Sequence, residues 1–140
     1  MAKRILYVDD DPDYVDWLCT TLKKAGYDCL LVADPAQARS ILNGAVQAGQ
    51  PLGGLVADLR MNDPASPTPN VKNLEVGVAF LQWVRDQVAF KDLPIIVVTA
   101  LSTDERLPGI KYLLRIKSIL QKPVPAKAFS DAVLSAFGPP

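Results

Sequence analysis

The candidate side chains for chemistry at the ends of the apolar stretches are carboxylates, one hydroxyl group and one ammonium group. Asp9, Asp10 and Asp11 follow the apolar stretch 4–8, and further candidates end or follow later apolar stretches: Asp58, Thr99 and Lys122. Carboxylates gathered within a few ångströms would need a divalent cation, and ligation by oxygen alone favours magnesium over zinc. With the hydroxyl and ammonium groups beside them, the set suits a phosphoryl group, which a carboxylate could attack.

The overall composition narrows the possible functions. The chain has 140 residues, of which 49% are hydrophobic, so one globular domain is expected. Its 15 basic and 15 acidic residues give a net charge of zero, which argues against nucleic acid or an anionic membrane as the main partner. The sequence contains no histidine, which excludes histidine-based catalysis, histidine-ligated zinc and a phosphohistidine on this chain.

Two cysteines, Cys19 and Cys29, lie within apolar patterns and show no motif spacing. We expect both to be free, buried thiols in a reducing compartment rather than a disulfide. The apolar stretch near the N-terminus is too short for the core of a signal peptide, and no segment reaches the length of a membrane span. The expected location is the cytoplasm.

The candidate residues must be positioned by strands and helices, which the hydrophobic pattern places in alternation. Apolar stretches predict five strands, at 4–8, 28–32, 55–57, 93–99 and 118–121. Asp11-Pro12 and Asp34-Pro35 each have the form of a helix start, with the aspartate as cap. Apolar residues at helical spacing predict three more helices: one carrying Gly77 to Val88, one beginning at the capping box 102–105 or at Pro108 with Leu113 on its apolar face, and one over 126–137.

This alternation predicts a parallel sheet covered by helices on both faces, which is the flavodoxin-like (βα)5 fold with strand order 2-1-3-4-5. In that order the first and third strands are neighbours, and the carboxyl ends of all strands meet at one edge of the sheet. Asp9 or Asp10 would then lie beside Asp58. Thr99 and Lys122 would lie on the other side of Asp58.

Taken together, these motifs resemble those of a CheY-like response regulator receiver domain. The resemblance covers essentially the whole chain and depends on four motifs that each close a predicted strand: Asp9-Asp10, Asp58-Leu59-Arg60-Met61, Thr99-Ala100 and Lys122-Pro123. Each motif alone is weak, but all four in this order are specific. The resemblance implies a single receiver domain over residues 1–140 that acts in two-component phosphorelay signalling and is a phosphoacceptor rather than an enzyme.

The resemblance also implies roles for individual residues. Asp58 would be phosphorylated by the phosphohistidine of a partner, either a sensor histidine kinase or a histidine phosphotransfer protein. Thr99 would hydrogen-bond to a phosphoryl oxygen and move toward it, and Lys122 would pair with the same group. The implied Mg²⁺ ligands are the side chains of Asp9, Asp10 and Asp58 and the backbone carbonyl of Arg60.

The sequence departs from the family pattern in two ways near the predicted site. An irregular, proline-rich insertion covers about 62–75, between the third strand and the third helix. It is either a tolerated surface loop or a segment that overhangs the acidic site and shapes partner access. Receivers commonly carry Tyr or Phe at the position of Ile119, so the usual aromatic switch is in doubt, and Tyr112 could act in its place.

A third departure is Pro108-Gly109, which interrupts the fourth helix in a region that receivers use for output. Five basic residues make this region locally positive: Arg106, Lys111, Arg115, Lys117 and Lys127. They are either a solvated surface or a docking face for an acidic protein partner. A solvated surface is the default interpretation, and docking of an acidic protein partner is the functional interpretation that we favour.

Two other functions stay open at this point. A degenerate receiver would bind partners without being phosphorylated. A small phosphohydrolase of the haloacid dehalogenase type would use Asp9 as the nucleophile and Asp11 as the acid. Such an enzyme needs a further acidic pair after Lys122, where only Asp131 follows, and it gives no role to Asp58.

Overall fold

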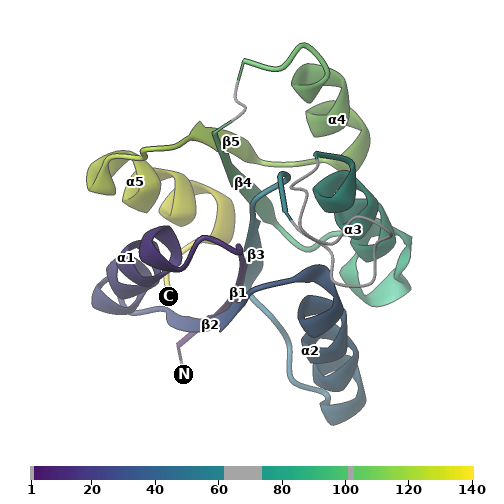
Figure 1. Cartoon of the computed structure of the whole chain (residues 1–140). Helices are drawn as coiled ribbons and strands as arrows, with labels where there is room; N and C mark the ends of the chain where they lie inside the picture. Colours follow the sequence, from purple (N-terminus) through teal and green to yellow (C-terminus); the bar gives the residue numbers. More distant parts are fainter. Residues whose placement is uncertain (1, 62–73, 101–102) are drawn as a thin grey trace.

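The computed structural model describes residues 2–61, 74–100 and 103–140, and for residues 12–15 the backbone alone. Its centre is a sheet of five parallel strands: β1 (Arg4–Val8), β2 (Asp28–Val32), β3 (Gly54–Ala57), β4 (Ile95–Thr99) and β5 (Ser118–Gln121). The helices are α1 (Pro12–Lys24), α2 (Pro35–Ala48), α3 (Leu74–Asp86), the short 3-10 helix η1 (Val88–Phe90), α4 (Leu107–Leu114) and α5 (Ala126–Phe137). The strand order is β2-β1-β3-β4-β5 (Figure 1), so the predicted flavodoxin-like topology is confirmed.

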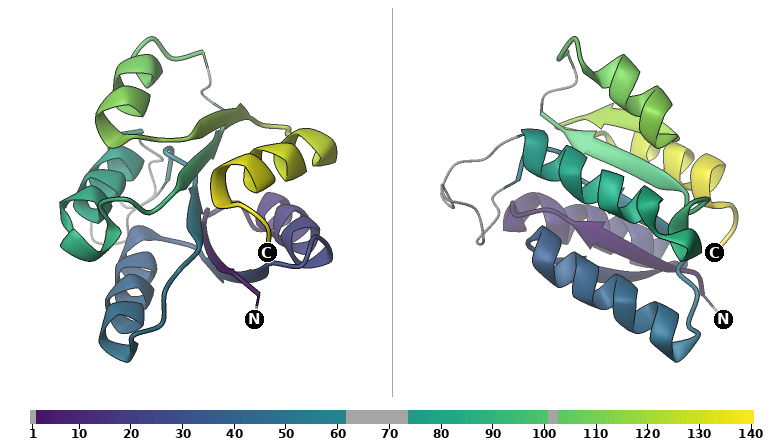
Figure 2. Two further views of the ribbon diagram at one scale, coloured as in Figure 1. Left: turned by 180° about the vertical axis from the view of Figure 1, so that it is seen from behind. Right: turned by 90° about the vertical axis from the view of Figure 1, so that its right-hand side faces the viewer.

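The helices cover the sheet in two layers (Figures 1 and 2). α1 and α5 pack on one face, and α2, α3 and α4 pack on the other. Residues of β1 alternate between the layers: Leu6 and Val8 face α2–α4, whereas Ile5 and Tyr7 face α1 and α5. All four are fully buried, because a strand covered on both faces has no solvent side. Burying a leucine, isoleucine or valine side chain contributes roughly 1.5–3 kcal/mol.

The register of β1 determines which side chains emerge together at the carboxyl edge. β1 pairs with β2 on one side and with β3 on the other, and Val8 is aligned with Ala57. The next residues, Asp9 and Asp58, therefore emerge side by side. The backbone N–H of Asp9 donates to Val32 O at 3.1 Å, and that of Asp58 donates to Val8 O at 3.1 Å. These bonds extend the ladder by one residue and fix the backbone of both aspartates.

The two predicted aspartate caps behave differently. The Asp34 side chain accepts a hydrogen bond from the backbone N–H of Gln37 at 2.8 Å, a capping bond of about 1 kcal/mol. Asp11 occupies the N-cap position of α1, but its side chain makes no capping bond. Its backbone N–H donates instead to Asp9 Oδ1 at 2.9 Å. The expected side-chain cap at Asp11 is therefore wrong, because the turn directs this residue toward Asp9 through its backbone.

α3 ends before the position that the apolar pattern predicts. It stops at Asp86, and Val88 lies in η1 with 85% of its surface exposed. Phe90 is buried in its place, since η1 turns the chain back toward the sheet. β4 also begins later than predicted, at Ile95, because Pro94 has no N–H to contribute to the ladder.

α4 begins at Leu107 with Pro108 in its first turn, which matches the second of the two predicted starts. Ser102 of the alternative capping box and residues 62–73 of the predicted insertion lie outside the described residues. The predicted end of the insertion at about 75 is wrong, because Leu74 and Glu75 already belong to α3. Leu113 was expected on the apolar face but is 72% exposed, because the inward positions of α4 are Leu107 and Leu114. Over the ranges that the structure describes, no helix is both long and apolar enough to cross a membrane.

Candidate functional site

The structure brings four candidate residues to the carboxyl edge of the sheet. Asp9 follows β1, Asp58 follows β3, Thr99 is the last residue of β4, and Lys122 follows β5. The backbone N–H of Lys122 donates to Thr99 O at 3.0 Å, which joins the ends of β4 and β5. Asp9, Asp58 and Thr99 are buried, and Lys122 is partly buried. These side chains share one small region although they come from four separate parts of the chain.

Lys122 connects the two aspartates. Its Nζ lies 2.8 Å from Asp9 Oδ2 and 3.0 Å from Asp58 Oδ2. The side chains of Lys122, Asp9 and Asp58 are 11%, 0% and 8% exposed. Charges this deeply buried are tolerated only when they are paired and hydrogen-bonded. The ammonium group therefore holds together two carboxylates that would otherwise repel each other.

The second oxygen of each carboxylate is held by its own loop. Asp9 Oδ1 accepts a hydrogen bond from the backbone N–H of Asp11 at 2.9 Å. Asp58 Oδ1 accepts one from the backbone N–H of Arg60 at 3.0 Å. In both cases an aspartate binds the backbone two residues further on, a turn that short acidic side chains favour. Each carboxylate is thus oriented at both oxygens, with one oxygen facing Lys122.

Burial alters the titration of Asp9 and Lys122. It raises the pKa of the Asp9 carboxyl, and the hydrogen bonds from Lys122 and Asp11 only partly oppose that effect. For Lys122, burial favours the neutral amine, but the hydrogen bond to Asp9 and the negative charges of Asp58 and Asp9 outweigh it and raise its pKa. Lys122 therefore stays positively charged at neutral pH.

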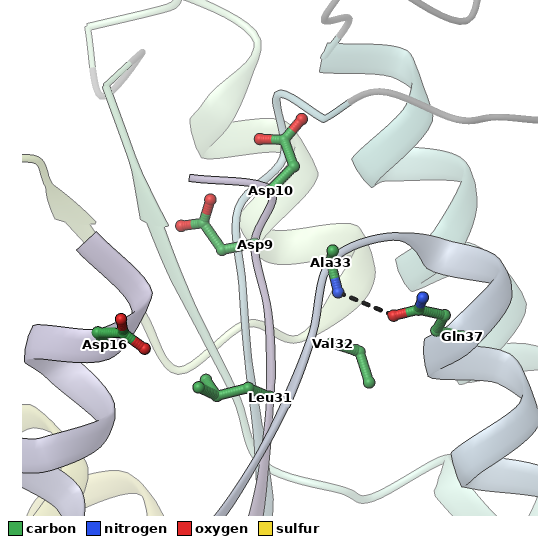
Figure 3. Close-up of a pocket in the computed structure, with 7 residues that line it drawn as sticks. All are labelled: Asp9, Asp10, Asp16, Leu31, Val32, Ala33 and Gln37. Carbon is green, nitrogen blue, oxygen red and sulfur yellow. Dashed lines mark hydrogen bonds between the residues drawn. The ribbon is translucent and has the colours of Figure 1, made fainter. Parts of the chain in front are cut away.

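A pocket of about 400 Å³ adjoins the site, between α1, the end of β2 and the start of α2 (Figure 3). Its lining residues are Asp9, Asp10, Asp16, Leu31, Val32, Ala33 and Gln37. Gln37 Oε1 accepts a hydrogen bond from the backbone N–H of Ala33 at 3.1 Å, which closes the α2 side of the pocket. In Figure 3, the carboxylates of Asp9 and Asp10 lie at the end of β1, and that of Asp16 lies on α1. The acidic surface therefore extends beyond the residues that contact Lys122.

The chemistry of these donors fits Mg²⁺, which prefers oxygen ligands. Two of the four predicted ligands, Asp9 and Asp58, lie together around Lys122. Asp10 lines the adjoining pocket instead. Within the described ranges, no group of three or more acidic or cysteine side chains is arranged to hold a metal ion. The complete ligand set, including the carbonyl of Arg60, therefore stays a prediction.

The predicted switch residues lie in contrasting environments. Ile119 is partly buried and packs against the core between the sheet and the α2–α4 layer. Tyr112 lies on α4 with 82% of its surface exposed.

The five basic residues of the predicted docking face are all exposed. Two of them have acidic partners nearby, Asp104 for Arg106 and Asp131 for Lys127.

Sequence reasoning missed the contribution of Gly77 to the site. Its backbone N–H donates to Leu59 O at 2.9 Å, and a Cβ atom at this position would lie 2.2 Å from the same oxygen. Only glycine lets α3 approach so closely to the residue that follows Asp58. The available signal was a glycine inside a helical pattern, which often marks close packing.

Comparisons with known proteins agree with this fold. No model of a known protein family matches the chain. The chain is similar to the transcriptional regulatory protein AruR of Pseudomonas aeruginosa, with 31% identity over 91 residues. That match covers 63% of this chain and 37% of AruR, so the chain corresponds to little more than a third of that relative. The structure of the bacteriophytochrome response regulator RtBRR has a TM-score of 0.73 and 27% identity, covering 100% of this chain and 85% of that chain. The chain has the fold of CheY-like response regulator receiver domains, and a single receiver domain fits it.

The chain also has the fold of the receiver domain of sensor histidine kinase PA1611 from Pseudomonas aeruginosa. The TM-score is 0.75 with 22% identity, over 99% of each chain. That structure is described with a magnesium ion coordinated in its active-site cleft. These receiver-domain neighbours support a role in two-component signalling in general terms.

Proposed function

We propose that this receiver domain accepts a phosphoryl group on Asp58 from the phosphohistidine of a sensor histidine kinase or a histidine phosphotransfer protein. An oxygen of the Asp58 carboxylate forms a bond to phosphorus while the bond between phosphorus and the imidazole nitrogen breaks. The phosphorylated domain then signals by binding a protein. The observation that carries this proposal is the contact of Lys122 Nζ with Asp58 Oδ2 at 3.0 Å, at the edge where the strands end.

Asp58 is a better nucleophile than Asp9 in this site. The Asp9 side chain is completely buried, whereas that of Asp58 is 8% exposed. Burial also raises the pKa of Asp9, which favours its neutral and less nucleophilic form. The same facts oppose a hydrolase that would use Asp9 as its nucleophile.

Lys122 and Thr99 would act on the phosphoryl group once it is attached. Lys122 already carries the positive charge that phosphoryl oxygens require. Thr99 is fully buried at the end of β4, where a hydroxyl could donate to a phosphoryl oxygen. Because Ile119 stands at the position of the usual aromatic residue, we assign the switch to Thr99, with Tyr112 as a second element.

Mg²⁺, when bound, would neutralise charge on the phosphoryl oxygens. Asp9, Asp10 and Asp58 would hold it together with the backbone carbonyl of Arg60. Lys122 engages Asp9 and Asp58 through one oxygen each, so we expect the ion to share these carboxylates with the ammonium group. The magnesium described for the PA1611 receiver domain supports this assignment.

For output, we propose an acidic protein partner that docks on the basic residues around α4 and the first turn of α5. Arg106, Lys111, Arg115, Lys117 and Lys127 are exposed there. The zero net charge of the whole chain disfavours nucleic acid and membranes as partners. We also propose a cytoplasmic location, which two free and buried thiols support.

Intact mass spectrometry after incubation with acetyl phosphate and Mg²⁺ tests the proposal. We expect the mass of one phosphoryl group on the wild type and on Asp34→Asn, a control at the N-cap of α2 beside the edge strand opposite β5, and no gain on Asp58→Asn. Absence of the adduct from the wild type would instead support a receiver that works without phosphorylation. Turnover of phosphate esters that is lost in Asp9→Asn and kept in Asp58→Asn would support a hydrolase.

A further inference from the structure

The guanidinium group of Arg85, near the C-terminal end of α3, binds five main-chain carbonyl oxygens. Nε donates to Leu114 O at 2.7 Å, and Nη2 donates to Arg115 O at 3.1 Å. Nη1 donates to the carbonyl oxygens of Phe90 at 3.0 Å, Lys91 at 3.2 Å and Leu93 at 2.7 Å. All three nitrogens of one side chain are therefore directed at the backbone.

These carbonyls belong to two segments that Arg85 joins. Leu114 and Arg115 end α4, where a helix leaves carbonyl groups without internal partners and favours a positive charge. The other three lie in η1 and in the turn that leads into β4. Burial lowers the pKa of Arg85, and the charge of Arg115 lowers it further, but a guanidinium keeps its proton in proteins. The link is thus a permanently charged one.

Other bonds fix the same end of α4. Arg115 Nη2 donates to Lys91 O at 2.8 Å, and the backbone N–H of Lys117 donates to Ile95 O at 2.8 Å. Figure 2 shows α4 running beside α3 on the same face of the sheet. The C-terminal end of α4 is therefore fastened to α3, to the turn after η1 and to β4.

The opposite end of α4 is held differently. The Asp104 carboxylate binds the backbone and side chain of Arg106, two residues away, at 2.8–3.0 Å. The backbone N–H of Leu107 donates to Asp104 O at 3.1 Å. These bonds stay within the segment that enters the helix, while the buried side chain of Leu107 provides the contact with the core. This end also follows Thr99 in the chain.

We propose that Arg85 makes the C-terminal end of α4 a fixed pivot, so that a displacement started at Thr99 moves the N-terminal end around Leu107. The use of the pivot rests on the proposed phosphorylation of Asp58, but the bonds of Arg85 that hold this end of α4 are present without it. Arg85 is thus a positioning residue that determines which half of α4 responds to the site.

Amide hydrogen exchange of the full chain, followed by NMR, tests the pivot without any phosphoryl donor. Arg85→Lys keeps the charge but cannot reach five carbonyls from one nitrogen. We expect the amides of Arg115 and Ile116 to exchange at least about tenfold faster, the effect of losing one hydrogen bond to a charged group, relative to the amides of β1. Arg106→Lys, at the other end of the helix, is the matched control and should leave them unchanged. Unchanged exchange in Arg85→Lys would overturn the proposal.

The wild-type protein tests the direction of movement of α4. Its result decides the proposal even when Arg85→Lys fails to fold. After treatment with acetyl phosphate and Mg²⁺, we expect chemical-shift changes at 107–110 and unchanged exchange at 112–116. Equal changes along the whole of α4 would contradict a pivot. If intact mass shows no adduct, the proposed phosphorylation fails instead, and the exchange comparison between Arg85→Lys and wild type still decides whether Arg85 fixes this end.

Discussion

The ammonium nitrogen of Lys122 lies 3.0 Å from Oδ2 of Asp58, although 64 residues separate them in the chain. The same nitrogen is 2.8 Å from Oδ2 of Asp9. One largely buried positive charge therefore faces two buried carboxylates. Leaving either the ammonium group or the carboxylates without a partner of opposite charge would carry a large free-energy penalty. This arrangement makes the site both a structural centre and a candidate for phosphoryl chemistry.

Replacing Lys122 by methionine should destabilise the fold, because it leaves the carboxylates of Asp9 and Asp58 buried without a positive partner. The expected loss is about 3–5 kcal/mol in the free energy of unfolding, measured by urea denaturation. Lys127→Met is the matched control, since its pair with Asp131 is exposed and should contribute about 0–1 kcal/mol. Similar losses in the two variants would contradict the buried ion pair.

Magnesium should stabilise the folded protein, because the ion would bind the assembled carboxylates and not the unfolded chain. At a concentration one hundred times its Kd, the expected gain is about 2.7 kcal/mol, seen as a rise in Tm. Asp9→Asn should reduce this gain, while Asp34→Asn, at the start of α2, should keep it. An equal effect of Mg²⁺ on both variants would mean that Asp9 is not a ligand.

Gly77→Ala should destabilise the protein, because the new Cβ would lie 2.2 Å from Leu59 O. Forcing atoms into a packed contact costs about 1–3 kcal/mol. Gly44→Ala, on α2 with nothing within 4 Å of the new Cβ, should stabilise by about 0.5–1 kcal/mol. Thermal unfolding of both variants gives the comparison, and a neutral Gly77→Ala would show that α3 can move away from the site.

Cys19 and Cys29 should resist alkylation in the folded state. Both are buried and free, and burial raises the pKa of Cys29 well above its usual range, with a further rise from its hydrogen bond with Cys19. The reactive thiolate form of Cys29 is therefore scarce. Iodoacetamide at mildly alkaline pH should modify neither residue until urea unfolds the protein. Rapid modification without denaturant would contradict the packing of α1 against β2.

Much of the fold follows from local patterns. The alternation of apolar strands with helical stripes predicts the parallel sheet, and the Asp34-Pro35 signal predicts the start of α2, because both depend on neighbours in sequence. Asp11 shows the limit of this reasoning. The same dipeptide starts α1, yet the backbone of Asp11 binds Asp9, a choice made by the turn at the sheet edge.

The sequence alone identified the residues at the strand ends and their chemistry, since each strand closes on a polar group. Only the tertiary structure decided that Lys122 contacts both Asp9 and Asp58 and that Arg85 binds the end of α4. Contacts between distant segments depend on the register of the sheet and the paths of the loops, which no local pattern encodes.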